Sequence, residues 1–307
     1  MQSKDKTKKP KFVSKYFFVI IGLPIVFWAF AFPVIKIGLT ELSPVNLTIM
    51  RLFITCIVFS LVYFLFRKKF SPLKKKDIFP IFLLGFLGII IYHFGLNYGE
   101  QYISASVSSL IIATIPIFTA IFAAIILKEN ITLKMVLGII LSLFGVIVIS
   151  TLGNEETSIE IQYIYGALAV VIASLVAAGY TIAGKKLLKR YSALSLTFYA
   201  FIFGSIGLLP FVGSSLFIEV ANMSYVGWSS VIFLSIFPTV IGYVLWYVAL
   251  EIKDASKLGV YLYFIPVLST IISFFLLDEK ITLFFLLGGV LVIIGLVIVN
   301  KQNKKND

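Results

Sequence analysis

The chain contains little cysteine, little histidine and little charge. Among its 307 residues, Cys56 is the single cysteine and His93 the single histidine. One cysteine excludes an intramolecular disulfide and a cysteine-based zinc site, and one histidine excludes a histidine-rich metal site. Only 13% of the residues are charged, about half the share of an average soluble protein. Because a water-soluble chain has to coat its surface with polar groups, this scarcity excludes an ordinary soluble domain.

Apolar residues are abundant instead. They make up 60% of the sequence, and the mean hydropathy is +1.06. Aromatic residues account for 16% and are spread along the chain without a charged heptad pattern, which argues against disorder and against a coiled coil. The net charge of +12 is compatible with nucleic-acid binding, yet lysine and arginine lie in the connectors between apolar runs. The pattern favours a protein of the lipid bilayer, and no nucleic-acid partner is expected.

Ten apolar runs are long enough to cross the membrane, whose hydrocarbon layer of roughly 30 Å takes about 20 helical residues. They cover approximately residues 16–39, 45–66, 78–98, 103–127, 133–151, 163–185, 193–212, 225–250, 255–277 and 283–299. A signal peptide is the alternative for the first run, because Ala29-Phe30-Ala31 has the small-x-small form of a cleavage site. The run continues to Leu39, beyond a usual signal core, so a membrane helix is the preferred interpretation.

The connectors alternate in charge. Lysine and arginine gather at both ends of the chain and in every second connector, whereas the remaining connectors are acidic. The positive-inside rule therefore predicts a multi-pass protein of the cell (inner, cytoplasmic) membrane with both termini cytoplasmic. The expected organisation is a basic cytoplasmic arm (1–15), a first repeat (16–151), an external linker (152–162), a second repeat (163–300) and a cytoplasmic tail (301–307).

The two halves of the chain repeat each other. A shift of 150 residues aligns Pro116 with Pro266, Glu129 with Glu279, Gly138 with Gly288 and Gly145 with Gly295, and a shift of 149 aligns the earlier helices more weakly. Each half contains five spans, an odd number, so the second half has to enter the membrane from the opposite side. The predicted fold is an all-α integral membrane protein with ten transmembrane helices arranged as two inverted five-helix repeats. Such repeats place a substrate site between the halves of secondary transporters.

These features resemble the drug/metabolite transporter (DMT) superfamily, specifically its ten-helix EamA type. The resemblance rests on residues repeated or spaced as in that type: Trp28, Lys36, Pro44, Arg51, Tyr102-Ile103-Ser104-Ala105-Ser106, Pro116, Glu129-Asn130-Ile131-Thr132, Gly138 and Gly145, with Ala255-Ser256, Pro266, Glu279-Lys280-Ile281-Thr282, Gly288 and Gly295 in the second half. The chain departs from duplication where Ala177 and Ala200 stand opposite Trp28 and Arg51. The resemblance implies an inner-membrane carrier, often an exporter, of amino acids, other metabolites or toxic small molecules.

Polar and aromatic residues inside the spans are candidates for a substrate cavity, because polar groups in a bilayer usually face a cavity or a partner. His93 and Asn97 lie on one face of the third span, and the repeat places Tyr243 and Tyr247 at the matching positions. Tyr92 lies on the same helix stripe as Gly85, Gly88, Gly95 and Gly99. Such a glycine stripe permits close helix packing, which favours a packing role for Tyr92 over substrate contact. The full set of candidates is His93, Asn97, Tyr92, Tyr243, Trp246, Tyr247, Trp28, Tyr180, Thr114 and Tyr263, with ordinary packing as the alternative for the aromatic residues.

Two basic residues are candidates for gating or for contact with an anion. Arg51 lies roughly 10 Å inside the second span at 1.5 Å per residue, where it can clamp a substrate carboxylate with two parallel hydrogen bonds. Lys36 lies less deep. The alternative for both is that the long side chain reaches back to the membrane surface.

Two prolines and two glutamates are expected to shape the helices. Pro116 and Pro266 interrupt equivalent spans, so each is expected to kink its helix. Glu129 and Glu279 stand at helix ends, and we expect each to cap the span that follows it. No Asp or Glu is expected near the middle of a span, which disfavours a carboxylate relay for protons and leaves His93 as the internal titrating group.

The predicted function is secondary transport, as an exporter of a small organic metabolite such as an amino acid or a related amphipathic compound, by alternating access. The expected partners are this substrate and the lipid bilayer, with no cofactor and no metal, in a monomer or a homodimer. A passive channel is the main alternative, since the same lining serves either. An intramembrane enzyme lacks a convincing nucleophile and base, and the sequence contains no glycine-rich phosphate loop for ATP-driven transport.

Overall fold

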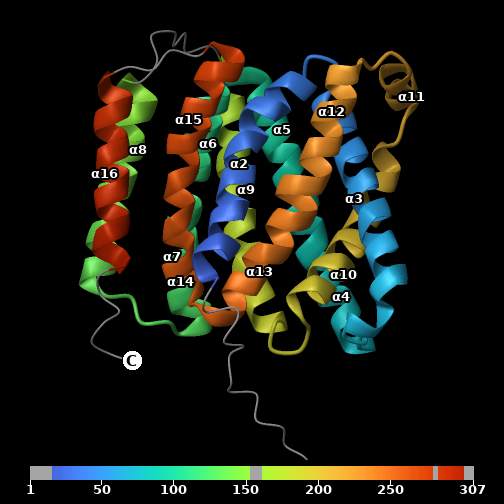
Figure 1. Ribbon diagram of the computed structural model, residues 1–307, viewed down its shortest axis with the longest axis horizontal. Helices are drawn as coiled ribbons and strands as arrows, with labels where there is room; N and C mark the ends of the chain where they lie inside the picture. The colour runs from blue at the N-terminus through green and yellow to red at the C-terminus, as the bar shows by residue number, and fades with distance from the viewer. Residues whose placement is uncertain (1–15, 153–160, 279–282, 301–307) are drawn as a thin grey trace, which may run out of the picture.

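The computed structural model describes residues 16–152, 161–278 and 283–300, and every regular element in these ranges is a helix (Figure 1). The predicted arm (1–15), most of the predicted linker and the predicted tail (301–307) lie outside the described residues. The first repeat comprises α2 (Phe17–Gly38), α3 (Pro44–Phe66), η1 (Arg67–Lys69), η2 (Lys75–Asp77), α4 (Ile78–Gly85), η3 (Phe86–Ile91), α5 (Tyr92–Tyr102), α6 (Ala105–Ile112), α7 (Ile115–Phe122), η4 (Ala123–Leu127) and α8 (Leu133–Leu152). The second comprises α9 (Ile161–Leu187), α10 (Ala193–Ser205), η5 (Ile206–Phe211), α11 (Ser214–Ala221), α12 (Tyr225–Leu234), η6 (Ser235–Ile241), α13 (Gly242–Ile252), α14 (Ala255–Gly259), η7 (Val260–Tyr263), α15 (Phe264–Leu277) and α16 (Leu283–Asn300).

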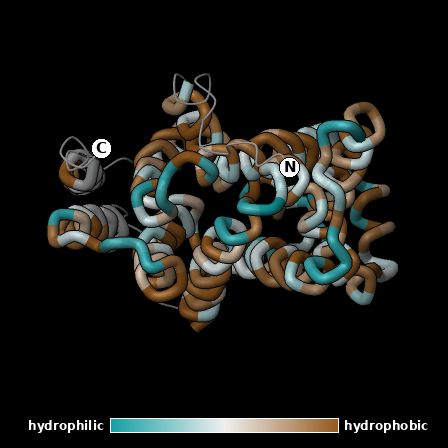
Figure 2. Tube along the Cα trace, turned by 90° about the horizontal axis from the view of Figure 1, so that it is seen from below, coloured by the Kyte–Doolittle hydropathy of each residue, from teal (hydrophilic) through white to brown (hydrophobic). Residues whose placement is uncertain are grey.

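The ten predicted spans correspond to ten helical passes. Within the described ranges, eight helical segments are long and apolar enough to cross a membrane, and α8 and α16 contribute shorter apolar helices. Large apolar side chains cover the outside: Phe18 is 75% exposed, Phe64 77% and Leu65 74%. Such a surface is unfavourable in water and favourable against lipid tails. Seen from below, hydrophilic segments gather where helices are joined, and α8 and α16 stand as a pair beside the main bundle (Figure 2).

The two repeats are inverted, as predicted. In Figure 1 the α6–α7 pass descends whereas the equivalent α14–α15 pass rises, and α8 rises whereas α16 descends. The described chain begins with α2 and ends with α16 at the same edge of the bundle. Five passes per repeat produce this arrangement, because an odd number returns the chain on the opposite side.

Glycines bring the third helix of the first repeat into close contact with the second repeat. A methyl group on Gly85 would lie 2.0 Å from the carbonyl oxygen of Ala200 in α10. A methyl group on Gly95 would lie 2.8 Å from the carbonyl oxygen of Ala169 in α9, and one on Gly99 would lie 2.7 Å from that of Gly166. The glycine stripe therefore permits the close helix packing that the sequence predicts.

Both repeats carry irregular turns at equivalent places. The π-helical segment η3 aligns, at a shift of 150, with residues 236–241 of the π-helical segment η6. A turn at residues 113–114 separates α6 from α7 just before Pro116, and the 3-10 segment η7 precedes the α-helical turn that holds Pro266. The carbonyl oxygen of Ile111, beside the first break, accepts hydrogen bonds from the hydroxyls of Thr114 (2.7 Å) and Ser174 (3.2 Å). The Thr114 amide also donates to this oxygen (2.9 Å), so the two hydroxyls add to the backbone bond that remains at the break.

Carboxylates of one repeat cap helices of the other. The Glu129 carboxylate accepts hydrogen bonds from the backbone amides of Ala255 (3.0 Å) and Ser256 (3.1 Å), at the start of α14. It does not cap the following helix α8 as expected, because the Thr132 hydroxyl accepts the bond from the Met135 amide there. Glu279 lies outside the described residues.

The opposite end of the bundle shows the same type of contact. Glu219 accepts from the Ser43 amide (2.9 Å) at the start of α3, and Glu41 accepts from the Ser224 amide (2.6 Å) at the start of α12. Hydrogen bonds from the Ser224 hydroxyl and amide lower the pKa of Glu41. Inter-repeat contacts at both ends therefore include a carboxylate on a helix N-terminus, where the helix dipole favours negative charge.

We expect Glu129→Ala to lower the stability of the protein more than Asp254→Ala does. Asp254 occupies the N-cap position of α14 but makes no capping hydrogen bond, and its ion pair with Lys257 is exposed. Removing the Glu129 bonds is expected to cost about 1–3 kcal/mol, whereas losing the exposed pair costs about 0–1 kcal/mol. The thermal midpoints of the two purified variants in detergent measure the difference. Equal midpoints would show that the cap between repeats contributes nothing.

A candidate cavity between the repeats

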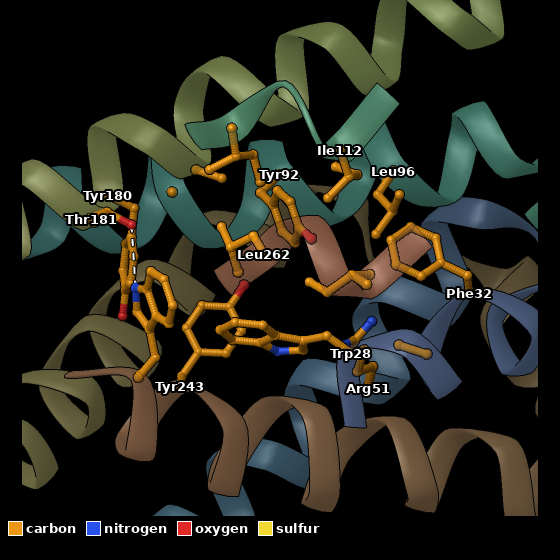
Figure 3. Close-up of a pocket in the computed structure, with 16 residues that line it drawn as sticks. Trp28, Phe32, Arg51, Tyr92, Leu96, Ile112, Tyr180, Thr181, Tyr243 and Leu262 are labelled. Carbon is orange, nitrogen blue, oxygen red and sulfur yellow. Dashed lines mark hydrogen bonds between the residues drawn. The ribbon is translucent and has the colours of Figure 1, made fainter. Parts of the chain in front are cut away.

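A cavity lies inside the bundle between the two repeats (Figure 3). Its volume is about 60 Å³. By the same measure of volume, one water molecule needs roughly 10–15 Å³. Sixteen residues line it. Those from the first repeat are Trp28, Ala31, Phe32, Arg51, Gly88, Tyr92, Leu96, Ile112 and Ile115, and those from the second are Ala177, Tyr180, Thr181, Tyr243, Trp246, Leu262 and Ile265.

Equivalent positions of the two repeats form the wall. The shift of 150 relates three pairs of lining residues, and the shift of 149 relates three more. These pairs are Leu96 and Trp246, Ile112 and Leu262, Ile115 and Ile265, then Trp28 and Ala177, Ala31 and Tyr180, and Phe32 and Thr181. Since both members of each pair reach one cavity, the axis that relates the repeats passes through or beside it.

The cavity lies at the middle of the membrane-spanning helices. Arg51 is seven residues inside the start of α3, and Trp246 is six residues before the end of α13 at the opposite edge. At 1.5 Å per residue these positions are roughly 9–10 Å from the helix ends. A solute in this cavity is therefore separated from both membrane surfaces by about two helical turns.

Two tryptophans present ring surfaces rather than hydrogen-bond donors to the cavity. The Trp28 ring lies edge-on to Trp246, with centroids 5.4 Å apart, and edge-on to Tyr243 at 5.9 Å. The Trp28 indole N–H donates to the carbonyl oxygen of Pro238 (2.8 Å), and the Trp246 indole N–H donates to the Thr181 hydroxyl (3.4 Å). Because protein atoms occupy both donors, the rings offer apolar contact.

Arg51 alone is charged among the residues that line the cavity in the described structure. It is 3% exposed, and its Nε donates to the Thr239 hydroxyl at 2.9 Å. Its Nη1 has no hydrogen-bond partner among the described residues. In Figure 3 the guanidinium and the hydroxyls of Tyr92 and Tyr243 point into the same space. The arrangement offers several donors to one acceptor group.

The π-helical segment η6 fixes the position of Arg51. The Thr239 hydroxyl donates to the carbonyl oxygen of Leu234 (2.7 Å) while it accepts from Arg51. The Ser235 hydroxyl donates to the carbonyl oxygen of Arg51 (3.0 Å), and the Thr55 hydroxyl donates to that of Ser235 (3.3 Å). π-Helical turns are frequent at functional sites. Sequence reasoning missed Thr239, although a polar residue after Pro238 inside an apolar span is a usable signal.

Three predicted cavity residues lie behind the wall instead of on it. His93 turns its Nδ1 back to the carbonyl oxygen of Ile89 (2.6 Å), so Nδ1 carries the proton, and its ring lies against Tyr243 at 6.2 Å. Asn97 donates to the Thr48 hydroxyl (2.8 Å). Tyr247 stacks on Tyr180 and donates to its backbone carbonyl (3.3 Å). All three are fully buried and pack next to lining residues or the helices that carry them.

The remaining predicted residues lie elsewhere. Thr114 uses its hydroxyl at the helix break, and Tyr263 is buried in a separate apolar cluster with Leu110 and Val260. Lys36 lines a different hollow, near the end of α2. Glu100, expected in a connector, is fully buried inside α5, one turn beyond Leu96. No group of three or more potential metal ligands occurs among the residues that the structure describes.

Sequence reasoning did not single out most of the apolar lining. Phe32, Leu96, Ile115 and Ile265 are typical of any apolar span, so composition does not distinguish them. The internal repeat is the signal that could have identified two more lining residues. Leu96 and Ala177 are the repeat equivalents of Trp246 and Trp28, which were singled out.

Comparison with known proteins gives consistent results. The EamA-like transporter family matches residues 15–151 and again residues 164–301. An uncharacterized transporter of Archaeoglobus fulgidus is 38% identical over 92% of this chain and 98% of its own length. The uncharacterized transporter YdfC of Bacillus subtilis is 35% identical over 93% of this chain and 91% of its own.

Two further similarities bear on function and fold. A probable terminal-alkyne amino-acid exporter of Streptantibioticus cattleyicolor is 29% identical over 91% of this chain and 92% of its own length. A crystal structure that is 19% identical in sequence superposes with a TM-score of 0.70, over 92% of this chain and 96% of the other. The latter match shows the same fold.

Proposed function

The chain belongs to the EamA-like transporter family, and on that premise we propose that it exports a small organic metabolite through the cavity between its inverted repeats. Membership makes the chain a membrane transporter rather than an enzyme. The observation that carries the finer proposal is the cavity itself, which lies at mid-membrane and takes equivalent residues from both repeats. This is the location expected for a substrate in a carrier that works by rocking two inverted units.

The contacts at the two ends suit alternating access. At one end Glu129 caps α14, and at the other Glu41 and Glu219 cap α12 and α3. Each contact joins one repeat to the other through backbone amides that water can satisfy when the contact opens. Rocking would therefore exchange contacts at one end for contacts at the other, while the cavity residues stay between the repeats.

The proposed orientation places the α2 start and the α16 end on the cytoplasmic side of the inner membrane. The connectors and the last turn of α9 at that edge carry Arg67, Lys74, Lys185 and Lys253, whereas the opposite edge carries Glu41 and Glu219. The positive-inside rule supports this orientation. The probable exporter from Streptantibioticus supports an amino acid or a related amphipathic compound as the class of cargo.

We propose that Arg51, Tyr92, Tyr180, Tyr243, Trp28 and Trp246 contact the solute. In this proposal His93 and Tyr247 hold Tyr243 and Tyr180 in position, and Asn97 fixes α5 to α3. Pro116 and Pro266 maintain the breaks that bring Ile112 and Leu262 to the cavity.

Proteoliposomes loaded with a mixture of metabolites test the function. We expect at least one small organic solute to leave faster than from protein-free liposomes, with a rate that saturates as its concentration rises. The same solute added outside is expected to accelerate its own efflux, because a carrier returns faster when loaded. Efflux that rises linearly with concentration and ignores external solute would instead identify a passive channel.

A further inference from the structure

The polar side chains that line the cavity all carry a hydrogen-bond donor, and one of them is positively charged. Arg51 supplies that charge, and the Tyr92 and Tyr243 hydroxyls point into the same space (Figure 3). We infer that the solute is an organic carboxylate with an apolar or aromatic body, and that its recognition needs no ammonium group. This inference rests on the proposed function, because it treats the cavity as the solute site.

The guanidinium of Arg51 is held ready for an anion. Its Nε is occupied by Thr239, which fixes the plane of the group, while Nη1 has no partner among the described residues. A buried cation without full hydrogen bonding is unfavourable unless a ligand completes it. A carboxylate accepts two parallel bonds from such a group and retains lone pairs for neighbouring tyrosine hydroxyls.

The lining offers little to an ammonium group. None of the sixteen lining residues is acidic. Glu100, fully buried on α5 one turn beyond Leu96, lies outside the lining and acts electrostatically on Arg51. The ring faces of Trp28 and Trp246 attract cations only weakly compared with a carboxylate partner, and Arg51 repels them. Within the lining, a carboxylate therefore meets a charge of opposite sign, whereas an amine meets a charge of its own sign.

The rest of the wall fits an apolar body. Phe32, Leu96, Ile115, Leu262 and Ile265 provide aliphatic and aromatic surface in addition to the two indole rings. These groups bind by apolar contact and fix no further polar group. The expected solute thus has one anionic end and one hydrophobic end.

Tryptophan fluorescence measures binding directly. Two of the three tryptophans, Trp28 and Trp246, line the cavity, and Trp228 lies outside its lining, 36% exposed on α12. The full-length protein with Trp228→Phe therefore reports from the cavity. The probes are two matched sets: 3-phenylpropanoate, phenylalanine and 2-phenylethylamine, then 4-methylpentanoate, leucine and 3-methylbutylamine. Within each set the body stays the same while the carboxylate or the ammonium group is removed.

We expect the carboxylate to bind at least about 10-fold more tightly than the amine in one set or both, and at least as tightly as the amino acid. Amine binding equal to or tighter than carboxylate binding overturns the inference. Tighter binding of the amino acid than of its carboxylate overturns the statement that no ammonium is needed. Absence of binding by both carboxylates at millimolar concentration also overturns the inference.

Substitutions test whether the positive charge that binds the carboxylate belongs to Arg51. Arg51→Gln is expected to weaken carboxylate binding by about 10- to 150-fold while amine binding weakens little or improves. Arg67→Gln, at an exposed arginine of η1, is the matched control and should change neither. If Arg51→Gln does not yield a monodisperse protein, Tyr92→Phe and Tyr243→Phe replace it, each expected to weaken carboxylate binding by about 2- to 10-fold. Unchanged carboxylate binding in every folded variant refutes the assignment.

Failure of this inference and failure of the proposed function are distinguishable. Fluorescence reports binding without transport, and proteoliposome efflux reports transport of any solute. A carboxylate that binds but never leaves the liposomes contradicts the exporter while the inference stands. Efflux of amines or neutral solutes, without carboxylate binding, contradicts the inference while the exporter stands.

Discussion

We expect Gly85→Leu to prevent the chain from reaching its folded state. Even a methyl group at this position would lie 2.0 Å from the carbonyl oxygen of Ala200 and 2.9 Å from the Cα of Gly204. Both obstacles are backbone atoms, so a side-chain rotation cannot relieve the clash and α4 has to move away from α10. Overpacking of this kind costs about 3 kcal/mol or more, a large share of the total stability of a typical protein.

The same substitution at Gly22 is the control. A Cβ at Gly22 in α2 meets no atom of a neighbouring element within 4 Å, so Gly22→Leu adds the same side chain to a helix where the Cβ has open space. The measurements are the yield of monodisperse protein by gel filtration and the thermal midpoint of whatever is recovered. A Gly85→Leu protein that is as abundant and as stable as Gly22→Leu would show that α4 and α10 do not cross closely.

The second large effect is loss of transport without loss of fold. Ala177 lines the cavity at the position equivalent to Trp28, so Ala177→Trp places a second indole in a cavity of about 60 Å³. We expect efflux of any identified solute to fall by at least about 100-fold, corresponding to roughly 2.7 kcal/mol. The thermal midpoint should stay the same or rise, because filling a cavity adds contacts.

Ile172→Trp controls for this change. Ile172 lies on the same helix α9 and is 53% exposed on the outside of the bundle, where an additional indole meets lipid. Its efflux and thermal midpoint should match those of the unmodified protein. Efflux that persists in a folded Ala177→Trp protein would mean that the solute takes another route, and the cavity would lose its proposed role.

The helices were predictable from the sequence because the membrane limits their length. The α15 pass ends at Leu277 and α3 at Phe66 as predicted, while both ends of α2 and the start of α3 differ from the prediction by one residue. Charged and turn-forming residues mark these ends clearly in an otherwise apolar chain. The third span shows the limit of this reasoning: the structure continues it to Tyr102, which brings Glu100 into the helix as a buried group.

The direction of individual side chains was less predictable. A regular α-helix turns by about 100° per residue, so one extra residue in a π turn rotates everything after it by about that angle. The segment η3 lies directly before Tyr92 and His93. In the structure Tyr92, expected to pack, lines the cavity, and His93, expected in the cavity, bonds to its own helix. Helical periodicity alone does not reveal such a turn.

The sequence by itself determined the membrane location, the ten passes, the inversion and the family, because hydrophobic length, an odd number of spans and a fixed repeat offset are properties of the chain's order. Only the tertiary structure decided which residues share the cavity and which partners they have. Arg51 meets Thr239, 188 positions away, and Glu129 caps a helix 126 positions away. Such pairs depend on how closely helices approach and how each is rotated, which glycine contacts and π turns set in three dimensions.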